Sequence, residues 1–308
     1  MTPSPEQIRL ILLGVIPPFV IAAIIFFFLA PKALPPADPV TSKLPGPRFA
    51  WVLPALLTAL FFVIQPIIAG KFVLYPQSAS EWPLLLCLIA FLLSLWAIAL
   101  NRPGAFRLLA RFGAIVTLGG FVALKFVPRW SAPELAAWLG LLGVFTTVAW
   151  FSLSHAVVLN KGISSVGILT LFTLAGAVAC EPGLSSLPSA QFIGIISWAL
   201  LGICAVALFR PNLRLAENAT HVPLLVTSLI TFAVMLGASD DPAWLKILFG
   251  AMMMLVPTLP FLVDAIWKPA APSIGRTILR LALAMIPVLV ILGVGGPRAL
   301  QALSNESY

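Results

Sequence analysis

Two titratable side chains lie close to the ends of long apolar runs in this sequence. His155 follows Phe151-Ser152-Leu153-Ser154, and Asp264 stands directly before Ala265-Ile266-Trp267-Lys268. Ionisable groups at membrane depth are costly and usually serve a function. A histidine and a carboxylate at similar depth can relay protons or couple a cation. The structural alternatives are hydrogen-bonded packing for His155 and, for Asp264, an interfacial pair with Lys268 one helical turn later.

Prolines interrupt three of the apolar runs. A proline inside a helix removes a backbone hydrogen bond, and the freed carbonyls can bind a substrate or an ion in transporters with discontinuous helices. Neighbouring helices can satisfy the same carbonyls. The helix-break candidates are Pro17, Pro18, Pro66, Pro257 and Pro260. The substrate-path candidates are Gln65, His155, Thr258 and Asp264.

Catalytic and cofactor motifs are missing from the sequence. It has no P-loop, HExxH, GxSxG or CxxCH pattern and only two histidines. Its three cysteines, Cys87, Cys180 and Cys204, lie in or beside apolar runs without metal-ligand spacing. We therefore expect no enzyme, no catalytic residue, no metal site and no cofactor.

Composition decides the class of protein. Of the 308 residues, 61% are apolar and 9% are charged, whereas a soluble domain is about 25% charged. A water-soluble globular protein is thereby excluded. The net charge of +8 is spread over short segments between apolar runs, which is typical of membrane topology and argues against nucleic-acid binding. The expected partner is the lipid bilayer of an inner or plasma membrane, with membrane-protein partners or a homo-oligomer left open.

The apolar runs predict an all-α integral membrane protein of about ten transmembrane helices with short loops. Each run approaches the length of about 20 residues that crosses a bilayer, and none alternates as a barrel strand would. The runs are 8–30, 50–69, 82–100, 109–127, 134–159, 163–180, 190–209, 222–238, 243–263 and 277–295. We interpret residues 1–308 as a single polytopic transmembrane domain, because no connection is long enough for a soluble one.

The distribution of basic residues predicts the orientation. Twelve of the 18 Lys and Arg residues lie in the segments 31–48, 101–111, 160–162, 210–221 and 264–280, which alternate with the segments on the other side. Since cytoplasmic loops carry the excess of Lys and Arg, both termini are expected outside. With this assignment, nearly all charged side chains lie at the ends of the spans.

An internal similarity suggests a tandem repeat of four helices. Residues 97–103 (AIALNRP) resemble residues 205–211 (AVALFRP) at an offset of 108, and Ser165-Val166-Gly167 resembles Ser273-Ile274-Gly275 at the same offset. The repeat units would be 82–180 and 190–295, preceded by the helices 8–30 and 50–69. Chance similarity between Ala/Leu-rich helices is the alternative.

Two hypotheses for the function follow. A small-molecule permease explains the helix count, the prolines and the repeat, and it requires polar side chains that converge on a cavity at membrane depth. A non-catalytic membrane scaffold or subunit of a larger complex explains the missing motifs and requires a filled, dry interior.

Overall fold

The described part of the chain is entirely helical. The computed structural model describes residues 5–30, 51–69, 82–99, 104–124, 126–184, 186–238, 241–266 and 274–305, and these ranges contain no strand. The helices are α1 (Pro5–Leu29), α2 (Val52–Ala69), α3 (Trp82–Ala99), α4 (Gly104–Ala123), α5 (Ala132–Leu159), α6 (Ile163–Val178), α7 (Leu187–Phe209), α8 (His221–Gly237), α9 (Ala243–Ile266) and α10 (Ile274–Asn305). The predicted all-α fold class is confirmed.

Seven of these helices are long and apolar enough to cross a membrane: α1 and α5 to α10. Helices α2, α3 and α4 contain shorter apolar segments, Val52–Ile67, Trp82–Trp96 and Leu108–Ala123. The multi-pass character of the chain is thus supported by length and composition. The count of ten spans and the four-helix repeat stay predictions.

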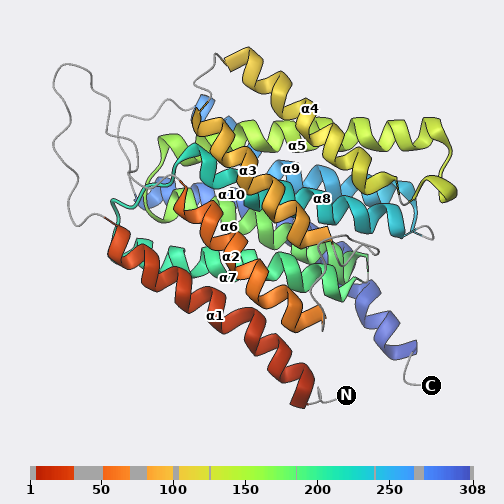
Figure 1. Cartoon of the computed structure of the whole chain (residues 1–308), viewed down its shortest axis with the longest axis horizontal. Coiled ribbons are helices and arrows are strands. Elements are labelled where there is room, and N and C mark those ends of the chain that lie inside the picture. The colour runs from red at the N-terminus through yellow and green to blue at the C-terminus, as the bar shows by residue number, and fades with distance from the viewer. Residues whose placement is uncertain are drawn as a thin grey trace.

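Successive helices run in opposite directions, so the bundle has two ends (Figure 1). We call one the Trp130 end, where α4 and α8 end and α5 and α9 begin. The other is the Asp264 end, where α5, α7 and α9 end and α6, α8 and α10 begin. Helix α1 begins and α10 ends at the Trp130 end, which agrees with termini on one side of the membrane. Which side that is stays a prediction.

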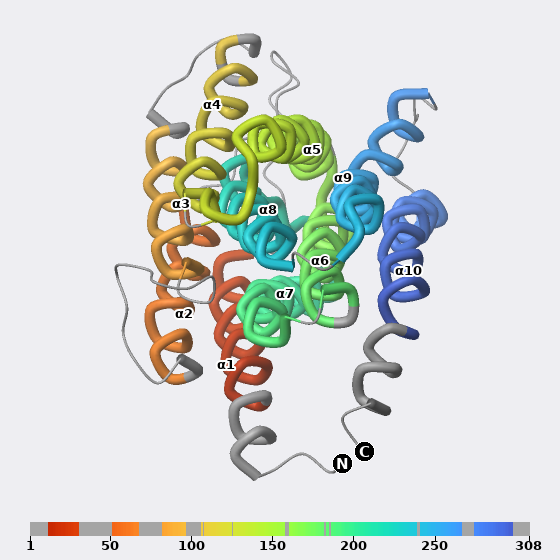
Figure 2. Tube along the Cα trace, turned by 90° about the vertical axis from the view of Figure 1, so that its right-hand side faces the viewer, coloured from red at the N-terminus to blue at the C-terminus, as the bar shows by residue number. Residues whose placement is uncertain are grey.

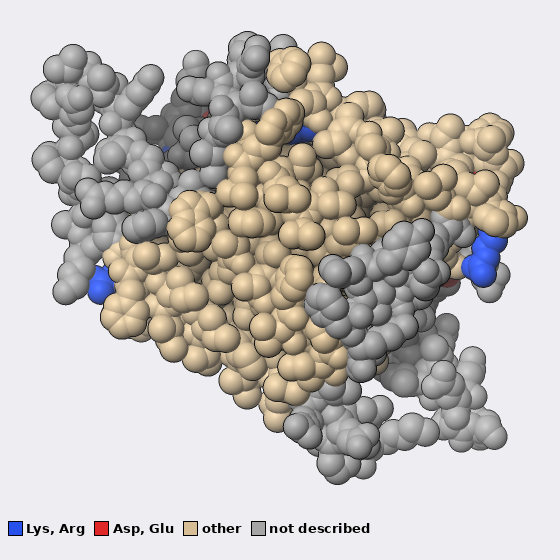
Figure 3. All heavy atoms as spheres, in the orientation of Figure 1, with Lys and Arg blue, Asp and Glu red and all other residues tan. Residues whose placement is uncertain are grey.

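Helix α8 forms the centre of the bundle (Figure 2). It contacts α2 to α7, and residues 221–236 are all buried. Helices α1, α4 and α10 lie outside and expose large apolar side chains such as Phe28, Leu109 and Leu289. Among the described residues visible in Figure 3, few side chains are charged, and most of these lie near the margins of the face. An apolar outer surface of this kind fits a hydrocarbon surrounding.

Helices α1 and α7 approach each other closely. Gly202 of α7 faces the backbone of α1, where an added Cβ would lie only 2.2 Å from the carbonyl oxygen of Phe19. A side chain at this position would push the two helices apart. Small residues permit such contacts between membrane helices, where van der Waals packing replaces the hydrophobic driving force.

The predicted helix breaks are not interruptions of the helices. Helix α1 continues through Pro17 and Pro18, α2 through Pro66, and α9 through Pro257 and Pro260. Each proline removes a single backbone donor while the helix runs on. A real irregularity occurs elsewhere, because α6 ends in a π-helical turn, η3 (Ala179–Gly183), that contains Pro182.

Candidate functional site

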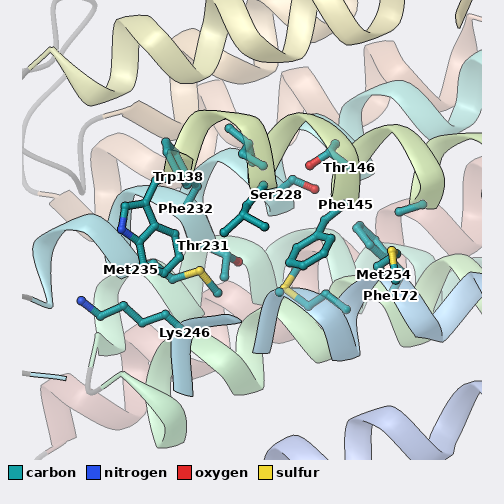
Figure 4. A pocket seen from close by; sticks show the side chains of 15 residues that line it. Trp138, Phe145, Thr146, Phe172, Ser228, Thr231, Phe232, Met235, Lys246 and Met254 are labelled. Atoms are coloured by element: carbon teal, nitrogen blue, oxygen red, sulfur yellow. The ribbon is translucent and has the colours of Figure 1, made fainter. Parts of the chain in front are cut away.

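A pocket lies between α5, α6, α8 and α9 in the half of the bundle nearer the Trp130 end (Figure 4). Its cavity volume is about 50 Å³, and the pocket is partly open to the outside. Along α5 the lining extends from Trp138 to Ala149, which at 1.5 Å per residue is about 16 Å. The pocket therefore reaches from the end of the bundle to its middle.

The lining of the pocket is mostly apolar, with four aromatic and three thioether side chains and a few polar groups. Three hydroxyls line it: Thr146 from α5 and Ser228 and Thr231 from α8. The Cys180 thiol donates a hydrogen bond to the Thr231 hydroxyl (3.6 Å). Each hydroxyl belongs to a buried residue, and a cavity that combines apolar walls with a few fixed polar groups is typical of small-molecule sites.

Lys246 of α9 contributes a cation to the same pocket. It is 1% exposed, and its Nζ atom lies 5.2 Å from the centre of the Trp130 ring. Figure 4 shows this ammonium and the indole nitrogen of Trp138 at one end of the pocket, away from Thr146. The aliphatic stem of the lysine covers the pocket wall while its charged head points toward the Trp130 end, as long basic side chains do near helix ends.

Beyond the deep end of the pocket, toward the Asp264 end, lies a group that we call the Arg111 cluster. Its members are Arg111, Trp150, Ser154, Glu217 and His221. Arg111 of α4 forms an ion pair with Glu217, which begins the short helix η4 (Glu217–Thr220), and it donates a hydrogen bond to the Ser154 hydroxyl (3.4 Å). Its guanidinium carbon lies 4.9 Å from the centre of the Trp150 ring.

Trp150 and His221 complete the Arg111 cluster. Their rings meet edge to face at 5.0 Å between centres. Both side chains are buried, and the Trp150 indole N–H has no partner among the described residues. A buried donor without a partner is costly. Trp150 immediately follows Ala149, the last pocket residue of α5, so the Arg111 cluster lies close to the deep end of the pocket along this helix.

The second group is the Asp264 cluster, formed by Asp264, Arg276, Arg280, Asn160 and Ser164. One Asp264 oxygen, Oδ1, accepts hydrogen bonds from Arg276 Nη2 (2.9 Å) and Arg280 Nε (2.9 Å) and lies 2.8 Å from Arg280 Nη2. Arg280 also donates to the side chains of Asn160 and Ser164. The cluster joins the ends of α5 and α9 to the beginnings of α6 and α10.

The structure places the four substrate-path candidates apart from the pocket. None of Gln65, His155, Thr258 and Asp264 lines it. Thr258 donates to the backbone carbonyl of Met254 (2.7 Å) and lies 3.3 Å from the Ser152 hydroxyl, so it bridges α9 and α5. Gln65 is completely buried, and neither polar atom of its amide has a partner among the described residues.

His155 lies near Asp264, and a shared proton-relay role for the two residues stays a prediction. They interact electrostatically, and the His155 ring packs edge-on against Phe261 at 4.9 Å. Asp264 has two arginine partners from α10 that the sequence analysis did not name. Lys268, its expected partner, lies outside the described residues.

Several basic residues that the sequence places at span ends are buried or lie well inside helices. Arg111 lies seven residues inside α4, because this helix begins at Gly104 rather than 109. Arg280 lies inside α10 and Lys246 in the first turn of α9, and both are buried. A single basic residue next to an apolar run was the available signal. It does not distinguish a loop position from the first turns of a helix.

Comparisons with known proteins do not add to this geometry. No protein-family model, curated protein or solved structure with which the chain was compared matches it. The functional argument therefore depends on the pocket and the two clusters.

Proposed function

We propose that this chain is a small-molecule permease that binds its solute in the pocket between α5, α6, α8 and α9. The observation that carries the proposal is the convergence of three buried hydroxyls on a cavity in an otherwise apolar bundle, with the buried Lys246 at one end of it. Polar side chains at membrane depth usually face substrate paths or water-filled cavities. A protein with a purely structural role gains nothing from such a cavity, because empty space costs packing energy.

The two clusters supply the gate that a permease needs. In this proposal, the Trp150 and His221 rings and the Arg111–Glu217 ion pair form the barrier between the pocket and the Asp264 end. The Asp264 cluster holds the neighbouring ends of α5, α6, α9 and α10 together. In alternating access, a site near the membrane centre is open to one side and closed to the other. The described arrangement corresponds to a state closed at the Asp264 end.

The lining of the pocket favours a small amphipathic solute. Phe145, Phe172 and Met253 offer flat and adaptable apolar surface, which suits an aliphatic or aromatic body. The hydroxyls of Thr146 and Ser228 suit a polar group at the other end of such a molecule. The solute would be an amino acid, a carboxylic acid or a compound of similar size.

One observation favours the scaffold hypothesis instead. None of the four residues selected as path candidates lines the pocket, and the clusters at the Asp264 end are ion-paired rather than open. If this arrangement never opens, the pocket is a packing defect and the chain is a structural subunit. The experiment must therefore test access to the pocket as well as flux.

The test uses the full chain in proteoliposomes. Uptake of radiolabelled aliphatic and aromatic amino acids and carboxylates is compared with uptake by empty liposomes. Gly250→Leu places a side chain in the pocket, since even a Cβ there would lie 2.9 Å from Phe145, and it is expected to reduce uptake at least tenfold. Gly140→Leu is the matched control, because a Cβ at Gly140 of α5 meets nothing within 4 Å.

Access is measured with Thr231→Cys and a membrane-impermeant maleimide. The native cysteines Cys87, Cys180 and Cys204 are buried, so background labelling is low. If the chain is a permease, the cysteine at position 231 is labelled from one side of the membrane, and the transported solute protects it from labelling. If no solute enters faster than in empty liposomes and residue 231 is labelled from neither side, the proposal fails and the scaffold hypothesis is favoured.

A further inference from the structure

Three cations from two chain connections lie together at the Asp264 end. Lys161 stands between α5 and α6, Arg210 directly follows α7, and Arg214 lies four residues further on. Backbone and side-chain hydrogen bonds join the two connections. The N–H of Gly162 donates to the carbonyl of Leu213 (2.8 Å), and Lys161 Nζ donates to the Asn212 side chain (3.2 Å).

The backbone geometry of this junction is specific. Gly162 has a φ of +61°, and an added Cβ would lie 2.9 Å from the carbonyl oxygen of Pro211. Only glycine adopts such a conformation at low cost. The two connections are therefore held at a distance that a side chain would not permit, and the three cations share one short stretch of surface.

These cations differ from the other basic groups of the same end. Arg111, Arg276 and Arg280 each pair with a carboxylate. Within the described residues, the side chains of Arg210 and Arg214 form no hydrogen bond and no ion pair, and the Nε atom of each is buried without a partner. A guanidinium that is partly removed from water is stabilised by a hydrogen bond to an anionic acceptor. Its planar donors match the oxygens of a phosphate.

An apolar surface adjoins the cations. The guanidinium of Arg210 lies 4.8 Å from the centre of the Phe27 ring of α1. Next to these two residues in the sequence, Phe28 is 81% exposed, Leu208 is 66% exposed and Phe209 is 77% exposed. Because α1 and α7 pack against each other, the cations stand at the end of an exposed hydrocarbon-like face.

We propose that Lys161, Arg210 and Arg214 bind the phosphate headgroup of an anionic lipid, whose acyl chains lie along the exposed apolar residues of α1 and α7. A phosphate supplies the missing acceptors for the two guanidinium groups, and the acyl chains cover Phe28, Leu208 and Phe209. A free phosphate would satisfy the cations but would leave the apolar face uncovered. The site is independent of the pocket and of the proposed transport.

The test compares headgroups on the unmodified full chain in detergent. Binding of dioctanoyl phosphatidylglycerol, dioctanoyl phosphatidylcholine and inorganic phosphate is followed by the rise in thermal unfolding temperature with ligand concentration. The proposal predicts at least tenfold tighter binding of phosphatidylglycerol than of phosphatidylcholine. Equal binding of the two lipids would overturn it, and phosphate that binds as tightly as phosphatidylglycerol would overturn the lipid assignment in favour of a free anion.

Variants locate the site. Each cation near a membrane surface contributes about 1 kcal/mol to binding of an anionic lipid, so Arg210→Gln combined with Arg214→Gln is expected to weaken phosphatidylglycerol binding about 30-fold. The double change to lysine keeps the charge and is expected to retain most of the binding. Arg129→Gln removes an exposed cation at the other end and serves as the control. Unchanged lipid selectivity in the double glutamine variant, or the same loss in the Arg129 variant, would refute the site.

Discussion

Replacement of Asp264 by asparagine tests whether the Asp264 cluster stabilises the bundle. In the protein, a single carboxylate oxygen lies within 2.9 Å of three nitrogen atoms of Arg276 and Arg280. Asparagine keeps the shape of the side chain and one acceptor oxygen. It removes the negative charge that balances the two guanidinium groups.

The expected loss follows from burial and from the partners that remain. Removal of one member of a buried ion pair costs about 3–5 kcal/mol. Here the side chain of Arg276 is 16% exposed, and Arg280 keeps its hydrogen bonds to Asn160 and Ser164. The amide oxygen of asparagine also still accepts a hydrogen bond. We therefore expect Asp264→Asn to lower the free energy of unfolding by about 2–3 kcal/mol.

The assay is unfolding of the purified chain in mixed micelles with a rising fraction of sodium dodecyl sulfate, followed by circular dichroism. A loss of 2–3 kcal/mol changes the ratio of folded to unfolded protein about 30- to 150-fold. In a double-mutant cycle with Arg280→Gln, the coupling energy between the two positions is expected to exceed about 1 kcal/mol. A loss below about 0.5 kcal/mol for Asp264→Asn, equal to that of exposed Arg129→Gln, would refute the reasoning.

Three further substitutions test packing, buried polarity and backbone strain. Gly202→Val is expected to lower the free energy of unfolding by about 2–3 kcal/mol in the same assay, because its side chain would collide with the α1 backbone. Gln65→Met is expected to raise it by about 1–2 kcal/mol, since the buried amide has no partner among the described residues. Gly162→Ala is expected to lower the free energy of unfolding by about 1–3 kcal/mol, because φ is +61° at this position. The loss would be detected as faster hydrogen exchange at the start of α6.

Matched controls separate these effects from a general sensitivity of the helices. Gly194 of α7 and Gly140 of α5 have nothing within 4 Å of an added Cβ, so Gly194→Val and Gly140→Ala should be nearly neutral. Equal losses at positions 194 and 202 would contradict the close approach of α1 and α7. Destabilisation by Gln65→Met would show that the amide of Gln65 is satisfied and contributes to stability.

The sequence predicted the helices well because their signal is local. A run of about 20 apolar residues is sufficient for a membrane helix whatever its neighbours are, and each of the ten runs corresponds to a helix. The boundaries were less certain where a basic residue stood at the edge of a run. Arg111 was assigned to a connection, although it lies inside α4 and holds Glu217.

The candidate site was predicted only in part because its contacts are distant in the sequence. For a carboxylate at position 264, helix geometry predicts a basic partner four residues later, and Lys268 stands there. Its arginine partners come from the next helix, 12 and 16 residues away. The pocket combines residues of four helices, from Trp138 to Met254, and hydrophobic periodicity does not specify which helices become neighbours.

The burial of α8 has a consequence for how the protein is made. This helix leaves the ribosome after seven others, yet it contacts α2, α3 and α4 as well as α5, α6 and α7. Helices α1 to α7 are therefore synthesised before the element that fills their centre. Until residues 221–236 arrive, that centre must be occupied by lipid or closed by a different packing of the early helices. When α8 arrives, it must displace that lipid or that earlier packing. The interior of the bundle therefore forms late in biosynthesis.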